Sequence, residues 1–120
     1  MNIAPVAYRY ARSLMDLATE RGQVDAVYAD MGLVADTTVA SRDLRVLLNS
    51  PVVKADKKSA VLDRVFAGKV GEETQRFIAI LVRKGREGML PQVAAAVQQL
   101  YKQQKGIVTA EVVSAVPLDD

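Results

Sequence analysis

Apolar residues recur every three or four positions along most of this chain, which is the period of an α-helix that is buried on one side. The first such segment is expected to run from Ala4 or Pro5 to Arg21, and Gly22 ends it. Pro5 suits the first turn of a helix, where its missing N–H has no partner to lose. The same period predicts further helices over residues 24–39, 41–48, 55–67, 72–84 and 90–104.

The pattern changes after Gly106. Residues 107–116 are rich in β-branched side chains and are followed by Pro117, which is typical of a strand. A lone strand leaves its backbone groups unpaired, and no other segment of the sequence has the pattern of a strand that could pair with it. We therefore expect an all-α six-helix bundle over residues 1–105. Residues 106–120 would be a linker and one orphan β-strand, the start of a truncated second domain.

Two of the predicted helices carry more apolar residues than one buried stripe needs. Val6, Met15 and Leu17 fall outside the stripe of the first helix, and Ile80 lies off the main face of the fifth. Surplus apolar surface on two helices can line a groove for an amphipathic partner helix. A bundle that surrounds its first helix would instead bury these residues, and periodicity alone leaves both interpretations open.

The amino-acid composition argues against most kinds of catalytic site. The chain has no Cys and no His, so it lacks thiolate ligands, the commonest general base and the commonest transition-metal ligand. Gly85 and Gly88 lack the lysine and spacing of a phosphate-binding loop and are interpreted as helix boundaries. Asp16 and Glu20, one turn apart, are interpreted as solvated acids. We expect no active site, no metal site and no cofactor.

The net charge of +2 does not identify a partner. Basic residues cluster at Lys57–Lys58 and around Arg83, Lys84 and Arg86, which keeps nucleic-acid binding open. Bases in the last turn of a helix are, however, favoured by the helix dipole, and no aromatic residues interleave with them as a stacking platform requires. No apolar run approaches the roughly 20 residues of a membrane span. We expect a soluble protein, or one bound to a membrane complex from its soluble side.

Four segments, taken in order, resemble the delta subunit of bacterial F-type ATP synthase, the counterpart of the mitochondrial oligomycin-sensitivity-conferring protein. They are residues 6–14 (VAYRYARSL), 47–53 (LLNSPVV), 76–86 (RFIAILVRKGR) and 110–118 (AEVVSAVPL). The first holds the family's Tyr-Ala pair, the second its Leu-x-Ser-Pro segment, and the third its Phe…Gly-Arg segment, with Arg76 replacing the usual Asn. The fourth resembles the strand that opens the family's second domain. Each motif is weak alone, but four at matching spacing are specific.

The resemblance implies a non-catalytic stator subunit. In that family a six-helix N-terminal domain sits on the catalytic head and binds the N-terminal helix of an alpha subunit, while the second domain grips the b-subunit stalk. The whole complex makes ATP from ADP and phosphate using a proton gradient. The resemblance therefore implies a peripheral place at the cytoplasmic face of the bacterial inner (plasma) membrane, with indirect membrane contact and no nucleic-acid partner.

Carried over by position, the family's docking surface falls on the first and fifth predicted helices. The residues it implies are Ala7, Tyr10, Ala11, Leu14, Arg76, Ile80, Arg83 and Lys84. Tyr10 is the best hot-spot candidate because it is aromatic with a polar tip, and the bases would favour an acidic flank on the partner. The alternative is a helical RNA- or protein-binding module of another assembly, with an antitermination-factor-like fold.

Overall fold

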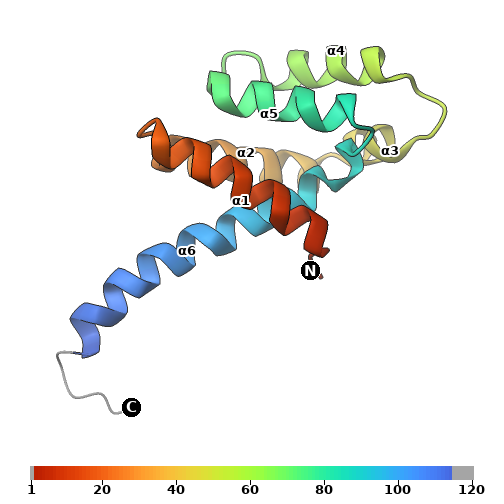
Figure 1. Ribbon diagram of the computed structural model, residues 1–120. Coiled ribbons are helices and arrows are strands. Elements are labelled where there is room, and N and C mark those ends of the chain that lie inside the picture. Colours follow the sequence, from red (N-terminus) through yellow and green to blue (C-terminus); the bar gives the residue numbers. More distant parts are fainter. Residues whose placement is uncertain (1, 115–120) are drawn as a thin grey trace.

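The computed structural model describes residues 2–114 of the chain, and the side chains of residues 2–106. All regular structure in this range is helical. In chain order the elements are α1 (Pro5–Glu20), α2 (Val24–Ala40), α3 (Arg42–Asn49), α4 (Ala55–Phe66), α5 (Glu72–Arg83), the short 3₁₀ helix η1 (Glu87–Met89) and α6 (Leu90–Ser114). The predicted six-helix bundle is therefore confirmed (Figure 1).

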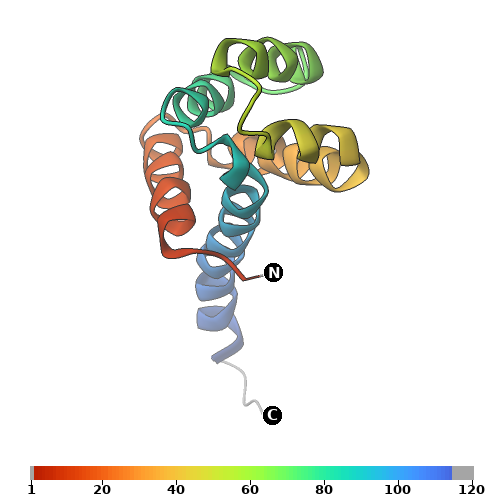
Figure 2. The same cartoon turned by 90° about the vertical axis from the view of Figure 1, so that its right-hand side faces the viewer.

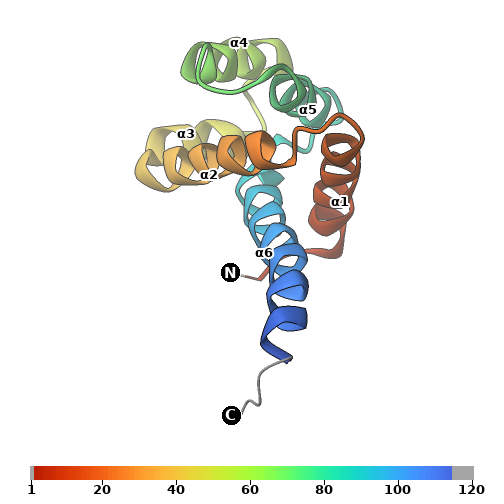
Figure 3. The ribbon, with the colours of Figure 1, turned by 90° about the vertical axis from the view of Figure 1, so that its left-hand side faces the viewer.

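The bundle is organised around α6. Its first half packs against both α1 and α2, and these two helices also contact each other. The α4–α5 pair lies on the far side of α1 and α2 from α6, with α3 and η1 linking the two groups (Figures 1 and 3). Helices distant in sequence thus meet around one centre, which places α1 beside α5.

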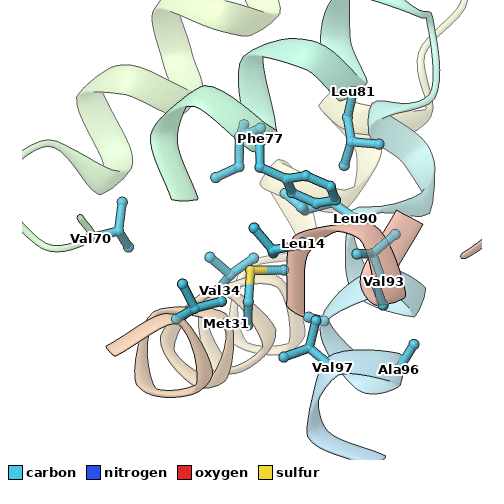
Figure 4. Close-up of a cluster of buried hydrophobic side chains, with 14 of the residues drawn as sticks. Leu14, Met31, Val34, Val70, Phe77, Leu81, Leu90, Val93, Ala96 and Val97 are labelled. Carbon is cyan, nitrogen blue, oxygen red and sulfur yellow. The ribbon is translucent and has the colours of Figure 1, made fainter. Parts of the chain in front are cut away.

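The centre is filled by aliphatic side chains, as the scarcity of aromatic residues in the sequence requires. Leu14, Met31, Val34, Leu81 and Val97 are almost wholly buried there. Figure 4 shows Leu14 and Met31 lying between the side chains of α5 above and of α6 below. Burying each such side chain contributes about 1.5–3 kcal/mol to folding, so this cluster is the main source of the bundle's stability.

The helix ends follow the local chemistry of the sequence. The Ser41 hydroxyl accepts a hydrogen bond from the backbone N–H of Leu44 at 3.1 Å, which caps α3. Gly22 and Gly85 follow α1 and α5 with φ values of +66° and +71°. This left-handed conformation is strained for any residue with a Cβ atom, so both glycines stop their helices where the sequence predicts.

The predicted orphan strand is wrong. Residues 107–114 continue α6 as a helix, and Gly106 lies inside that helix instead of ending it. Residues 115 and 116, the rest of the expected strand, lie outside the described residues. The physical reason is backbone pairing: a strand needs a neighbour, whereas a helix satisfies its N–H and C=O groups internally. The helix penalty of β-branched residues, at most about 0.7 kcal/mol each, is too small to reverse that preference.

The second half of α6 projects away from the other helices (Figure 2). A small cluster holds α6 where it leaves the bundle. The rings of Tyr28 and Tyr101 stack with centroids 3.8 Å apart, and the Tyr101 hydroxyl donates to Asp25 Oδ1 at 2.7 Å. Lys105 Nζ lies 5.3 Å from the centre of the Tyr101 ring. These contacts tie α6 to the start of α2.

Candidate partner-helix groove

Helices α1 and α5 run antiparallel with an open groove between them. Arg21 Nη1, just after α1, lies 3.2 Å from Glu73 Oε2 in the first turn of α5. At the other end, Lys84 after α5 lies beside Arg9 and Tyr10 of α1. The cavity between these ends has a volume of about 330 Å³. We call it the α1–α5 groove; it is lined by Tyr10, Ser13, Leu14, Leu17, Arg21, Glu73, Arg76, Phe77 and Ile80.

The floor of the groove is apolar and its walls are partly open to solvent. Leu14 and Phe77 are buried beneath it, whereas Leu17 and Ile80 remain 38% and 39% exposed. The Tyr10 and Phe77 rings meet edge to face across the groove, with centroids 6.4 Å apart. Half-exposed aliphatic walls over a buried aromatic floor are the form of a site for the apolar face of an amphipathic helix.

The position of α5, one wall of the groove, is set by a side chain from α2. Asp30 Oδ2 accepts hydrogen bonds of 2.8 Å from the backbone N–H of Gly71 and from the Thr74 hydroxyl. Gly71 is the N-cap position of α5 and has no side chain of its own to cap the helix. A carboxylate at a helix N-terminus is favoured by the free N–H groups and by the helix dipole. Asp30 therefore fixes where α5 begins.

The structure brings together only part of the docking surface expected from the sequence. Tyr10, Leu14, Arg76 and Ile80 line the groove. Lys84 lies at its end, where it lines a smaller cavity of about 180 Å³ with Arg9, Tyr10 and Ser13.

The other three expected residues lie elsewhere. Ala7 and Ala11 have no exposed surface and belong to the hydrophobic core. Arg83 is exposed but lines neither cavity.

Five of the groove's lining residues are absent from the docking surface implied by the family, although the hydrophobic pattern had marked one of them, Leu17, as surplus apolar surface: Ser13, Leu17, Arg21, Glu73 and Phe77. Leu17 had a usable signal, because it was an apolar residue outside the buried stripe of its helix. Phe77 is buried in the core and also forms part of the groove floor. Arg21 and Glu73 come from helix ends whose pairing depends on the tertiary packing.

Two other features considered in the sequence can be located in the structure. Lys58, half of a basic pair considered for nucleic-acid binding, is only 4% exposed and contacts Glu87 Oε2 at 2.6 Å, so it is not available to a phosphate backbone. Among the described residues, no group of acidic residues is arranged to hold a metal ion. No helix in that part of the chain has the length and hydropathy needed to cross a bilayer.

Comparison with known proteins agrees with the resemblance. The family model described as ATP synthase delta (OSCP) subunit matches residues 6–120. ATP synthase subunit delta of Chlorobium luteolum is 39% identical over 110 residues, covering 92% of this chain and 61% of that protein. The same subunit of Chlorobium phaeobacteroides strain BS1 is 41% identical over 112 residues, covering 93% and 62%, and that of Cytophaga hutchinsonii is 36% identical over 115 residues, covering 96% and 63%. The chain thus spans less than two thirds of the length of these relatives, and it belongs to the ATP synthase delta (OSCP) subunit family.

Proposed function

We propose that this chain is a non-catalytic stator component of an F-type ATP synthase, and that its α1–α5 groove binds the N-terminal helix of an alpha subunit. Family membership supports the assembly. The main support for the proposed binding site is the groove itself, which has an apolar floor and half-exposed Leu17 and Ile80 on facing walls. A stator needs affinity without chemistry, and the groove offers a mainly apolar floor with half-exposed aliphatic walls.

The contacts divide between anchors and support. Tyr10, Leu14 and Ile80 would meet the apolar face of the partner helix, and Arg76 and Lys84 its polar edge. Ala7 and Ala11 would act beneath the groove, because their small side chains let α1 pack closely on α6. Burying a few hundred Å² of apolar surface at about 25 cal/mol per Å² provides several kcal/mol before the costs of association.

The division of labour along the chain follows from the family. Residues 1–105 would form the head-docking domain, and residues 106–120 would lead toward a part of the longer protein that grips the b-subunit stalk. The assembly would hold the chain peripherally at the cytoplasmic face of a bacterial plasma membrane. The complex as a whole would make ATP from ADP and phosphate with a proton gradient, and this subunit would keep the catalytic head from turning with the rotor.

Calorimetric titration of the 120-residue chain with a peptide of the alpha-subunit N-terminus from the same organism tests the docking. We expect saturable binding that Ile80→Asp abolishes, because a charge then replaces an apolar wall of the groove. Val46→Asp is the matched control, since Val46 is exposed on α3 and does not line the groove. No binding at high micromolar peptide, or equal loss in both variants, would reject the groove as the docking site.

A further inference from the structure

The charged residues along the α1–α5 groove are unevenly distributed, because acids occur near only one of its ends. On α1, Arg9, Asp16 and Glu20 are seven and eleven residues apart, so at 100° per residue they lie within about 40° of one another on one face of the helix. Arg9 lines the cavity at one end of the groove. Asp16 and Glu20 directly precede the lining residues Leu17 and Arg21 toward the other end.

The rim of α5 has the same order in space. Glu73 and Lys84 are also eleven residues apart and share a face, and both line the groove or its end cavity. Because α1 and α5 run antiparallel, Lys84 comes beside Arg9 while Glu73 comes beside Arg21. The end of the groove at Arg9 and Lys84 is therefore basic. The other end holds the acids Asp16, Glu20 and Glu73 together with the bases Arg21 and Arg76.

The basic end is free of compensating charge. No Asp or Glu occurs in residues 2–15 or 74–86, which contain the parts of α1 and α5 at that end, and the next acid along the chain, Glu87, is paired with Lys58. Among the described residues, neither Arg9 nor Lys84 takes part in an ion pair. At the acidic end Glu73 is paired with Arg21 and Glu72 with Arg76, but Asp16 and Glu20 have no ion-pair partner in the described part of the chain.

Helix stability does not explain this order on α1. Acids are favoured in the first turn of a helix and bases in the last, yet α1 has no acid in its first turn, no base in its last, and Glu20 as its final residue. Glu20 is therefore in a position that the dipole of α1 disfavours, whereas Arg9 and Asp16 lie outside its terminal turns, where the dipole has little effect. On α5 the order of charges agrees with the helix dipole, so the stability of that helix is enough to explain it.

We infer that the groove selects the direction of its partner helix by charge: the acidic end of the partner lies over Arg9 and Lys84, and its basic end lies over Asp16, Glu20 and Glu73. This inference rests on the proposed function, since it needs a helix in the groove. The occupant is a helix with one apolar face and with acids and bases segregated toward opposite ends. Coulombic steering orients such a helix as it approaches, and the apolar groove then holds it.

Two synthetic peptides with the same apolar face separate charge from chain direction. One carries Glu in its first half and Lys in its second half, and the other has the reverse order; each bears a nitroxide label at its C-terminus. Paramagnetic broadening of the chain's amide signals reports where each label lies. We expect the acid-first peptide to broaden signals near Glu73 and the base-first peptide to broaden signals near Arg9. Broadening at the same end by both peptides would overturn the inference.

Charge reversal in the protein provides the second measurement. The double variant Arg9→Glu with Lys84→Glu should lower the affinity for both the base-first and the acid-first peptide by about tenfold at low salt. This loss of affinity should be smaller at high salt. Arg12→Glu with Lys57→Glu is the matched control, because it makes the same change in net charge at exposed residues outside the groove. Equal weakening in the two double variants would overturn the inference.

The alpha-subunit peptide distinguishes this failure from that of the proposed function. The alpha-subunit peptide could bind when neither synthetic peptide binds, or when both synthetic peptides bind in the same chain direction. In either case only the selection of direction by charge is rejected. If none of the three peptides binds, the groove is not a helix site, and the proposed function fails together with the inference.

Discussion

Lys58 on α4 and Glu87 in η1 form a buried ion pair, with 2.6 Å between Nζ and Oε2. Lys58 also donates to the carbonyl oxygen of Leu48 at the end of α3. The ammonium thus joins three elements, while Glu87 Oε1 is buried and has no hydrogen-bond partner among the described residues. An ion pair in this setting stabilises the fold mainly by avoiding an unpaired buried charge.

Lys58→Met should lower the free energy of unfolding by about 3 kcal/mol, because Glu87 is left as an uncompensated buried carboxylate. Urea denaturation monitored by circular dichroism measures this. Lys57→Met, at the exposed neighbouring position, should change the stability by less than about 0.5 kcal/mol. The double variant Lys58→Met with Glu87→Leu should recover part of the loss; a double variant as unstable as the single one would show that the charge is not the cause.

Asp30→Ala should weaken both the fold and the groove. Removing the carboxylate leaves the Gly71 N–H and the Thr74 hydroxyl without their acceptor, and the expected loss of stability is about 1–2 kcal/mol. Because α5 then loses its fixed start, affinity for the alpha-subunit peptide should fall as well. Asp36→Ala on the exposed face of the same helix is the control. Full affinity in Asp30→Ala would mean that the wall is positioned by other contacts.

Tyr10→Ala should weaken binding of the same peptide by more than about 1 kcal/mol, since it removes an aromatic wall and the edge-to-face contact with Phe77. The domain should remain folded, as Tyr10 is only partly buried. Tyr8→Ala is the matched control: Tyr8 lies two residues away on α1 and lines a different cavity against α6. If Tyr10→Ala unfolds the domain, Tyr10 is a core residue and not an anchor.

Tyr101 should titrate at higher pH than a free tyrosine. Its pKa is raised first by the hydrogen bond that its hydroxyl donates to Asp25, then by desolvation and by the charge of that carboxylate. Because the pKa is raised by folding, the contact stabilises the folded state below the normal tyrosine pKa and is lost as pH rises through the higher folded value. Phenolate absorbance should show Asp25→Asn lowering the pKa of Tyr101, with Asp36→Asn as control. An unchanged titration in Asp25→Asn would disprove the assignment.

Gly106→Pro should interrupt α6 without unfolding the bundle. Gly106 lies inside the helix but beyond the residues that form the core, and a proline there removes a backbone hydrogen bond at a cost of about 3 kcal/mol. Helical circular dichroism should fall while the midpoint of thermal unfolding stays the same. Gly106→Ala should have the opposite effect on helicity. A proline variant with unchanged helicity would show that residues 107–114 are not helical in solution.

Local sequence patterns predicted the helices well because several neighbouring residues indicate each helix. The stripe of α1, the Ser41 cap and the left-handed glycines all depend on contacts within a few positions. The strand over residues 107–116 was wrong because β-branched composition reports a preference that only a neighbouring strand can fulfil.

The groove was half predictable for a related reason. Off-stripe Ile80 correctly indicated exposed apolar surface on α5. The pairing of Arg21 with Glu73, and the capping of α5 by Asp30, join residues 52 and 41 positions apart in the chain. Hydrophobic periodicity does not contain that information, so the sequence identified wall residues and Lys84 at one end of the groove but not the Arg21–Glu73 end or the support from Asp30.

The path of α6 has a mechanical consequence. This helix of 25 residues is about 37 Å long at 1.5 Å per residue, and its first half backs α1 where Ala7 and Ala11 are buried. A pull on its projecting end therefore reaches the bundle at the rear of one groove wall. A helix seated in the groove would resist that displacement, and tension that shifts α1 would alter the hold on the seated helix by the same coupling energy. If the proposed docking is correct, the seated helix and a load on α6 would both act on α1, which contacts α6 and lines the groove.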